Sequence, residues 1–266
     1  MAVGPQSWAA DVSASISLSY HTSGLTGKGV KVPDLLGSEL DGAANRVARE
    51  SLPRVPVYVV SPPSCLKTDQ NCYAPGGTDE CANVKSTWAV YNAAYSDNPS
   101  NGVYVCICQG SPVSAQSLAS NYSQVPLHLR RWVASVSYVP ASQGHAYTSA
   151  GHITFFGTFG FDVLVHESTH AQDQGFSGSK AYLQAIGSDP CVPDDYAQTN
   201  NVECYAQDMV VFLYKLWRPY DQPLGTNGGY CAKRLQNQLL PHSKARGDPG
   251  QHCIRLEATA SVIDTL

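Results

Sequence analysis

The sequence predicts an α+β protein in which a mixed β-sheet packs against two core helices. Three observations lead to this fold class. Up to about residue 156 the apolar residues come in short alternating or β-branched runs, which are typical of strands. After Phe161 they recur at helical spacing in two long segments. Hydrophobic residues make up 43% of the 266 residues and charged residues only 14%, so the chain can build a sizeable core.

We expect a single domain over residues 1–266, with a sheet-rich part over 1–150 and the helices of a candidate metal site over 151–266. Residues 64–83 are rich in Cys, Gly and Asp and are expected to form a loop held by disulfides. The patterns in the first part predict strands over 11–20, 55–60, 103–108, 132–139 and 151–156, and helices over 38–50, 83–95 and within 114–133.

The second part is expected to contain two long helices. Asp162 is placed to cap the first helix and Gly175 to end it. Either Asn200 or Asn201 can cap the second, which must end before Pro219 and has a broad apolar face. Between them we expect a short helix over 179–187 and a Pro-containing loop over 188–198.

Nine cysteines indicate an oxidising compartment and therefore secretion. Cys106 and Cys108 fall on one predicted strand and are expected to pair with different partners, which suits disulfides better than a metal knuckle. We interpret the set as four disulfides and one remaining thiol; the alternative is a reduced protein with many buried thiols. Cys204 is a candidate for the remaining thiol, or is simply a small buried helix residue. The first residues lack the features of a secretory leader, so secretion implies that a leader has been removed.

The charge and hydropathy of the chain argue against two classes of partner. A formal net charge of −4 and a pI near 6.0 give no basic surface for nucleic acid or anionic lipid. The sequence has no run of 18 apolar residues that could span a bilayer. We expect a secreted monomer that acts on a protein or peptide.

The motif His166-Glu167-Ser-Thr-His170 carries the strongest chemical signal. On a helix, residues four apart lie about 40° apart around the axis, so both imidazoles can hold one ion. Glu167 lies about 100° further round and can reach an ion-bound water without becoming a ligand. This arrangement suits a hydrolytic Zn²⁺ site with Glu167 as general base. The alternative is that all three residues lie on an ordinary helix surface, but apolar neighbours such as Val165 favour the functional interpretation.

A catalytic zinc ion usually has three protein ligands and one water. Glu203, in the first turn of the second long helix, is the predicted third ligand because it shares the inward stripe with Ala206, Gln207 and Val210. An unpaired carboxylate on an apolar helix face is costly, and a metal ion would compensate it. The alternative is a solvent-facing glutamate favoured by the helix dipole. Other acidic or imidazole groups stay open as third ligands: Asp173, Asp194, Asp195 and His152. Asp173 is better suited to orient one of the ligand side chains than to bind the ion itself.

The motif with its downstream glutamate resembles the zincin metallopeptidases, and Asn201-Val-Glu203-Cys-Tyr-Ala206 resembles the second helix of their gluzincin branch. The stretch from Phe161 to Asp173 is also similar to a group of secreted fungal proteins regarded as peptidases, which includes conidiation-specific protein 13. The resemblance to gluzincins implies a zincin-like fold, with His166, His170 and Glu203 as zinc ligands and the motif glutamate as base. The cysteine count adds the expectation that this fold is disulfide-stapled.

The chain departs from the gluzincin pattern in two places. Val202 is inserted between Asn201 and Glu203, and Gln207 stands where an aspartate is common. A carboxylate that orients a zinc-bound histidine must then come from elsewhere, and Asp173 is a candidate. An oxyanion donor is also needed, for which the candidates are Tyr196, Tyr205 and His242.

The sequence therefore predicts a secreted zinc metallopeptidase, most simply an endopeptidase. Two other function classes stay open. One is a secreted binding or wall- or spore-associated protein that has the same fold without proteolysis. The other is a zinc hydrolase or lyase that acts on a non-peptide substrate through the same residues.

Overall fold

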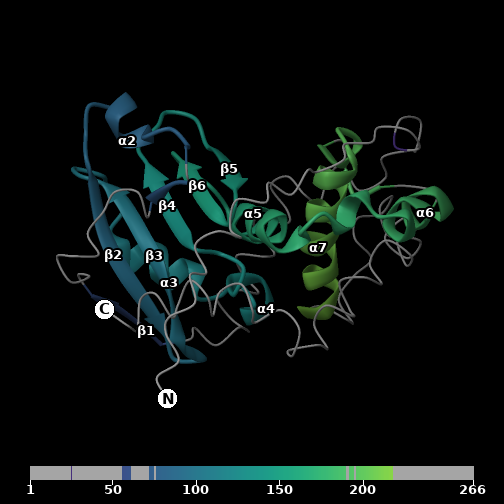
Figure 1. Cartoon of the computed structure of the whole chain (residues 1–266), viewed down its shortest axis with the longest axis horizontal. Helices are drawn as coiled ribbons and strands as arrows, with labels where there is room; N and C mark the ends of the chain where they lie inside the picture. The colour runs from purple at the N-terminus through teal and green to yellow at the C-terminus, as the bar shows by residue number, and fades with distance from the viewer. Residues whose placement is uncertain are drawn as a thin grey trace, which may run out of the picture.

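The computed structural model describes Leu25 and residues 56–60, 72–74, 76–189, 192–194 and 196–217. The predicted strand over 11–20, the helix over 38–50 and the first part of the loop over 64–83 lie outside these residues, as does the tail after 217. The described part is an α+β arrangement of one mixed sheet and several helices, as predicted (Figure 1). Among the described residues, no helix is long and apolar enough to cross a membrane.

The sheet has six strands in the order β1-β2-β3-β4-β6-β5. Strands β1, β2 and β3 are antiparallel neighbours, β3, β4 and β6 are parallel, and β5 returns antiparallel to β6 at the end of the order. The strands are β1 (Val57–Val60), β2 (Trp88–Tyr95), β3 (Asn98–Cys108), β4 (Ser135–Val139), β5 (His145–Ser149) and β6 (His152–Phe156).

Short helices lie among the strands, and the longer helices follow β6 in the chain. Helix α5 lies between the sheet and α7, and α6 lies beyond α7 (Figure 1). The helices are α2 (Glu80–Asn83), α3 (Ala115–Tyr122), α4 (Leu127–Arg130), α5 (Phe161–Asp173), α6 (Lys180–Ser188) and α7 (Asn201–Trp217), with 3-10 turns η5 (Phe176–Gly178) and η6 (Tyr196–Gln198).

Two local predictions were wrong. Residues 83–95 do not form a helix: after the short α2, the chain extends as β2, because the hairpin with β3 supplies its hydrogen bonds and overrides the alanines at 89, 93 and 94. The N-cap of α5 is Gly160 and not Asp162. Asp162 lies instead in the first turn, where a negative charge suits the helix dipole.

The two faces of the sheet are buried by different material. Alternate residues of β3, Val103, Val105 and Ile107, join the main apolar cluster, to which α3, α4, α5 and α7 also contribute. The residues that alternate with these along β3 are Tyr104, Cys106 and Cys108, and they belong to a second cluster on the opposite face. We call these the helix face and the disulfide face.

Two disulfides tie the segment before α2 and α2 itself to β3. Cys72 pairs with Cys106, and Cys81 pairs with Cys108. The two cysteines of the strand therefore have different partners, as predicted. Cys204 is buried and lies outside both disulfides. The remaining four cysteines lie outside the described residues, so the predicted total of four disulfides stays a prediction.

Candidate metal centre

Helix α5 presents both histidines of the motif on one side. Its opposite side is anchored by Leu164 and Val165, which are buried in the main apolar cluster. His166 and His170 are one turn apart, with ring centroids at 4.5 Å and ring planes almost perpendicular. The His166 side chain is only 10% exposed, so the pair lies in a partly dry environment. Anchoring of the apolar side thus fixes the direction in which both imidazoles point.

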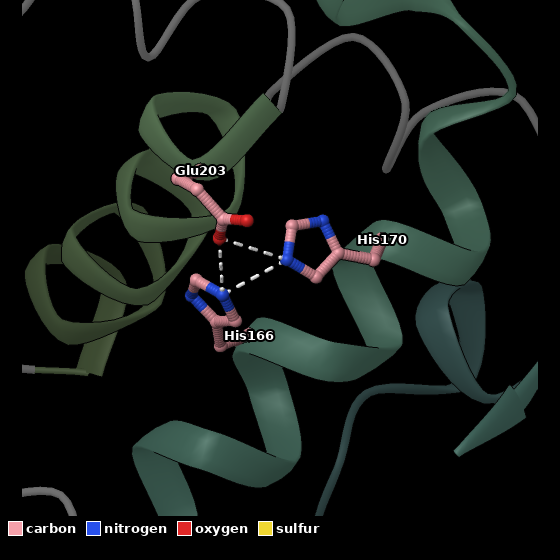
Figure 2. Close-up of side chains that lie close together, drawn as sticks. All are labelled: His166, His170 and Glu203. Atoms are coloured by element: carbon pink, nitrogen blue, oxygen red, sulfur yellow. Dashed lines mark hydrogen bonds and ion pairs between the residues drawn. The ribbon is translucent and has the colours of Figure 1, made fainter. Parts of the chain in front are cut away.

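Glu203 comes from the first turn of α7, which packs across α5. Asn200 caps this helix, since its Oδ1 accepts hydrogen bonds from the backbone of Val202 and Glu203. The Oε2 atom of Glu203 lies 3.0 Å from Nε2 of His166 and 3.1 Å from Nε2 of His170. The two Nε2 atoms are 2.9 Å apart (Figure 2). Three side chains predicted to share one ion therefore converge on one point.

The donor set fits a zinc ion by both geometry and chemistry. A tetrahedral ion with bonds of about 2.1 Å would separate its ligand atoms by roughly 3.4 Å, so the observed triangle needs to open by only about 0.4 Å. Without a proton or a cation between them, two imidazole lone pairs and a carboxylate oxygen at about 3 Å would repel one another. Two histidines and one glutamate are a known ligand set of catalytic zinc.

The charges of the site shift the pKa values of its groups. Burial alone lowers the pKa of His166, but the hydrogen bond to Glu203 and the negative charges of Glu167 and Glu203 outweigh it and raise that pKa. Burial alone raises the pKa of Glu203, but the hydrogen bonds with the two histidines hold it well below its usual range. The carboxylate is thus ionised and the site attracts positive charge.

Glu167 is buried beside the triad and is held by the end strand of the sheet. The hydroxyl of Thr148, on β5, lies 2.7 Å from Oε2 of Glu167 and 2.9 Å from its backbone oxygen. The charge of Glu167 acts on the pKa of His166, so the carboxylate is within electrostatic reach of the triad. Its orientation is therefore set by β5 rather than by α5 alone.

The second ring nitrogen of His166 is also occupied. Nδ1 lies 3.0 Å from Oε1 of Gln207, one turn beyond Glu203 on α7. The amide nitrogen of Gln207 donates in turn to Oδ2 of Asp194 at 2.6 Å. Oδ1 of Asp194 accepts a hydrogen bond from the backbone of Ala197. A continuous line of hydrogen bonds thus leads from the candidate ligand to the loop before α7.

Residues 55–262 match the family model described as conidiation-specific protein Con-13. The chain belongs to the Con-13 family. It is also 30% identical over 179 residues to conidiation-specific protein 13 of Neurospora crassa. That match covers 62% of this chain and 52% of the relative, so it spans about half the length of the curated protein. No solved structure matches the chain.

The other candidate ligands of this Con-13 family member have different roles. Both carboxylate oxygens of Asp173 accept hydrogen bonds from Ser177, so Asp173 holds the turn after α5. Its link to the site is the charge interaction with His170 and not a hydrogen bond to a histidine. Asp194 is buried against Gln207. His152 lies on β6, with Nδ1 2.8 Å from the Ser135 hydroxyl. Asp195 lies outside the described residues.

Of the two candidate oxyanion donors among the described residues, Tyr196 lies at the site. The ring of Tyr196 is 5.7 Å from that of His166, and the residue is 53% exposed. Burial and then the charges of Glu203 and Glu167 raise the pKa of Tyr196 to about 12, so the phenol keeps its proton. Tyr205 is buried and its hydroxyl donates to Gln172. His242 lies outside the described residues.

Two site residues were missed by sequence reasoning. Thr148 was missed because the five-residue strand β5 was not predicted. Gln207 was placed on the inward stripe with Glu203 and noted as a departure from the gluzincin pattern, but no role at the site was assigned to it. Its spacing of one helical turn from Glu203 was a usable signal for Gln207, whereas the approach of β5 to Glu167 depends on the folded sheet.

Proposed function

We propose that this member of the Con-13 family is a secreted zinc metallopeptidase with a zincin-like active site. The convergence of Nε2 of His166, Nε2 of His170 and Oε2 of Glu203 on one point, beside a buried glutamate, is the observation that carries the proposal. The family name refers to conidiation and states no reaction, so the support comes from the chemistry of the site. The two disulfides are compatible with secretion.

The residues divide the work of hydrolysis in a simple way. His166, His170 and Glu203 would hold a zinc ion, which lowers the pKa of a bound water to about 7. Glu167 would act as the general base that accepts a proton from the attacking water and returns it to the leaving nitrogen. Tyr196, whose ring lies 5.7 Å from that of His166 and whose raised pKa keeps the phenol protonated, would be the donor to the oxygen of the attacked carbonyl.

The position of β5 favours a peptide substrate over a small molecule. β5 ends the strand order of the described sheet, and its Thr148 contacts the proposed base. An extended peptide could add to such an edge by main-chain hydrogen bonds, which would bring its carbonyl groups beside Glu167. We accordingly propose a protein or peptide substrate and a monomeric enzyme.

The test is zinc content and hydrolysis in a small set of variants. The wild-type protein should hold one zinc per chain by elemental analysis and cleave casein or a peptide library. Glu203→Ala should lose both zinc and hydrolysis, because two histidines alone leave the ion without its carboxylate. Glu167→Gln should keep the zinc and lower turnover by about 10²–10⁴-fold, the usual worth of a general base.

Glu80→Gln is the matched control, since it makes the same change to a carboxylate on the disulfide face. It should keep zinc and turnover. Zinc without any hydrolysis would instead favour a binding protein that has the same fold. Turnover of a small molecule in place of peptides would favour a non-peptide hydrolase or lyase, and absence of zinc would remove the proposal altogether.

A further inference from the structure

The line of hydrogen bonds from His166 through Gln207 to Asp194 differs in its donors and acceptors from what the resemblance to gluzincins implies. Where an aspartate is common in that branch, this chain has an uncharged amide, Gln207, with a carboxylate, Asp194, behind it. The donors and acceptors along this line of hydrogen bonds determine which ring nitrogen of His166 keeps a lone pair that can bind an ion.

Asp194 sets the direction of the whole line. An ionised carboxylate only accepts hydrogen bonds, and its Oδ1 already accepts one from the backbone of Ala197 at 2.7 Å. The group of Gln207 that faces Oδ2 of Asp194 at 2.6 Å must therefore be the NH₂. The amide oxygen of Gln207 then faces His166, and an oxygen there can only accept.

The consequence for the imidazole is a fixed tautomer. Nδ1 of His166 must carry a proton in order to donate to Gln207 at 3.0 Å. A neutral ring with a proton on Nδ1 has its lone pair on Nε2. Nε2 is the atom that faces Glu203 and His170 in Figure 2. A metal ion needs that lone pair, and the partner of the other nitrogen prepares it.

We propose that Asp194, acting through the amide of Gln207, is the positioning residue that keeps the His166 imidazole in its metal-binding tautomer. The pair takes the place of the single carboxylate that usually orients a zinc-bound histidine. The same pair connects the site to the 3-10 turn η6, because Asp194 accepts a hydrogen bond from Ala197 and Tyr196 is the first residue of η6. The inference rests on the metal site of the proposed function but not on peptide hydrolysis.

Isosteric exchanges of amide and carboxylate test the proposal. In Asp194→Asn, the side-chain oxygen still serves Ala197, so an NH₂ group now faces Gln207. The Gln207 amide must turn over and present its NH₂ to Nδ1 of His166. The ring then carries its proton on Nε2, and zinc affinity should fall about 10–100-fold. In Gln207→Glu, two carboxylates face each other, and affinity should fall by a similar factor.

The double variant Asp194→Asn, Gln207→Glu should recover what each single variant loses. The asparagine NH₂ donates to the new glutamate, and the glutamate accepts the Nδ1 proton of His166, so every hydrogen bond is satisfied again. Zinc affinity should return to within about threefold of wild type or exceed it, a large non-additivity for two contacting residues. Affinity is measured by competition with a chromophoric chelator.

The histidine tautomer is the second readout, and simple loss of stability would not change it. Nitrogen-15 NMR is done on histidine-labelled, metal-free protein that also carries Glu203→Ala, so that no carboxylate faces Nε2 of His166, and at a pH above the titration of that ring. In this background the native Asp194–Gln207 pair and the double exchange should both show the Nδ1–H form of His166. Asp194→Asn should show the Nε2–H form. Gln207→Met is a further variant for the case that one of the single variants fails to fold. It removes the acceptor and keeps the shape, so the His166 ring should lose its preference for one tautomer.

The results can overturn this inference separately from the proposed function. An Nε2–H tautomer in the Glu203→Ala protein with the native pair, an unchanged tautomer when Asp194→Asn is added, or no recovery of zinc affinity in the double variant would each overturn it. If the tautomers follow the expected pattern but the wild-type protein cleaves no peptide, the peptidase proposal fails and the role of Asp194 stands.

Discussion

The two faces of the sheet are covered in different ways, one by packed helices and the other by a short disulfide-linked segment. On the helix face, three helices and α7 behind them cover the strands with a continuous apolar cluster. On the disulfide face, a short segment and the one-turn helix α2 cover the strands, held by the Cys72–Cys106 and Cys81–Cys108 bonds. The same strands supply both faces through the alternation of their side chains.

The difference shows where the chain can place costly polar groups. The candidate metal site stands on the thick helix face, where apolar packing of α5 offsets the burial of His166 and Glu167. The disulfide face buries several polar side chains of its own, among them Ser135, Ser137 and Thr154. Because α2 and its segment can bury little apolar surface, covalent links replace packing there.

The largest expected effect is a loss of stability on the disulfide face that leaves the metal site on the helix face unchanged. Replacing Cys72 and Cys106 together by alanine opens a loop of 34 residues, and the chain-entropy model gives a loss of about 3–4 kcal/mol in the free energy of unfolding. Zinc affinity and turnover of the folded variant should stay as in wild type, because the site lies on the other face. Denaturant unfolding and chelator competition measure the two quantities.

Cys204→Ala is the control for this prediction. It removes a buried thiol outside both disulfides and should cost only about 1 kcal/mol. A fall in zinc affinity that follows the loss of the disulfide would show that the helix face depends on the disulfide face, against the division proposed above.

The next effect concerns the pH dependence of the disulfide face. Burial lowers the pKa of His152 from 6.5 to about 4. Between these values the unfolded chain binds a proton that the folded chain does not, so the free energy of unfolding should fall as pH falls from 6.5 to 4. The loss amounts to roughly 3 kcal/mol at most. His152→Asn should flatten this part of the stability profile in denaturant titrations.

The exposed His145, on the neighbouring strand β5, provides the comparison. His145→Gln should keep the wild-type slope between pH 6.5 and 4. If His152→Asn also keeps the full slope, the neutral state of this half-buried imidazole is not the source of acid sensitivity in this part of the sheet.

The helix face was more predictable from sequence than the disulfide face. Helix α5, helix α7 and the pairing of His166 with His170 follow from periodicity and spacing along single helices, which are local. The choice of Glu203 on the other helix also depended on the resemblance to gluzincins. The helix predicted over 83–95 was wrong because β2 is defined by its partner β3, which local propensity does not contain. The partners of Cys106 and Cys108 were unknowable for the same reason, although their divergence was predicted.

The contact between Thr148 and Glu167 is a sharper instance of that limit, because it joins strand and helix across the helix face. Thr148→Val removes the hydroxyl and keeps the shape, so Glu167 should lose part of its orientation, and kcat should fall about tenfold, the equivalent of roughly 1.4 kcal/mol. Zinc content and KM should stay unchanged, and Thr148→Ser should recover most of the rate. Ser149→Ala, on the same strand but facing the disulfide side, should have no effect on turnover. Equal rates for Thr148→Val and Ser149→Ala would show that the end strand does not position the base, and would leave α5 alone to do so.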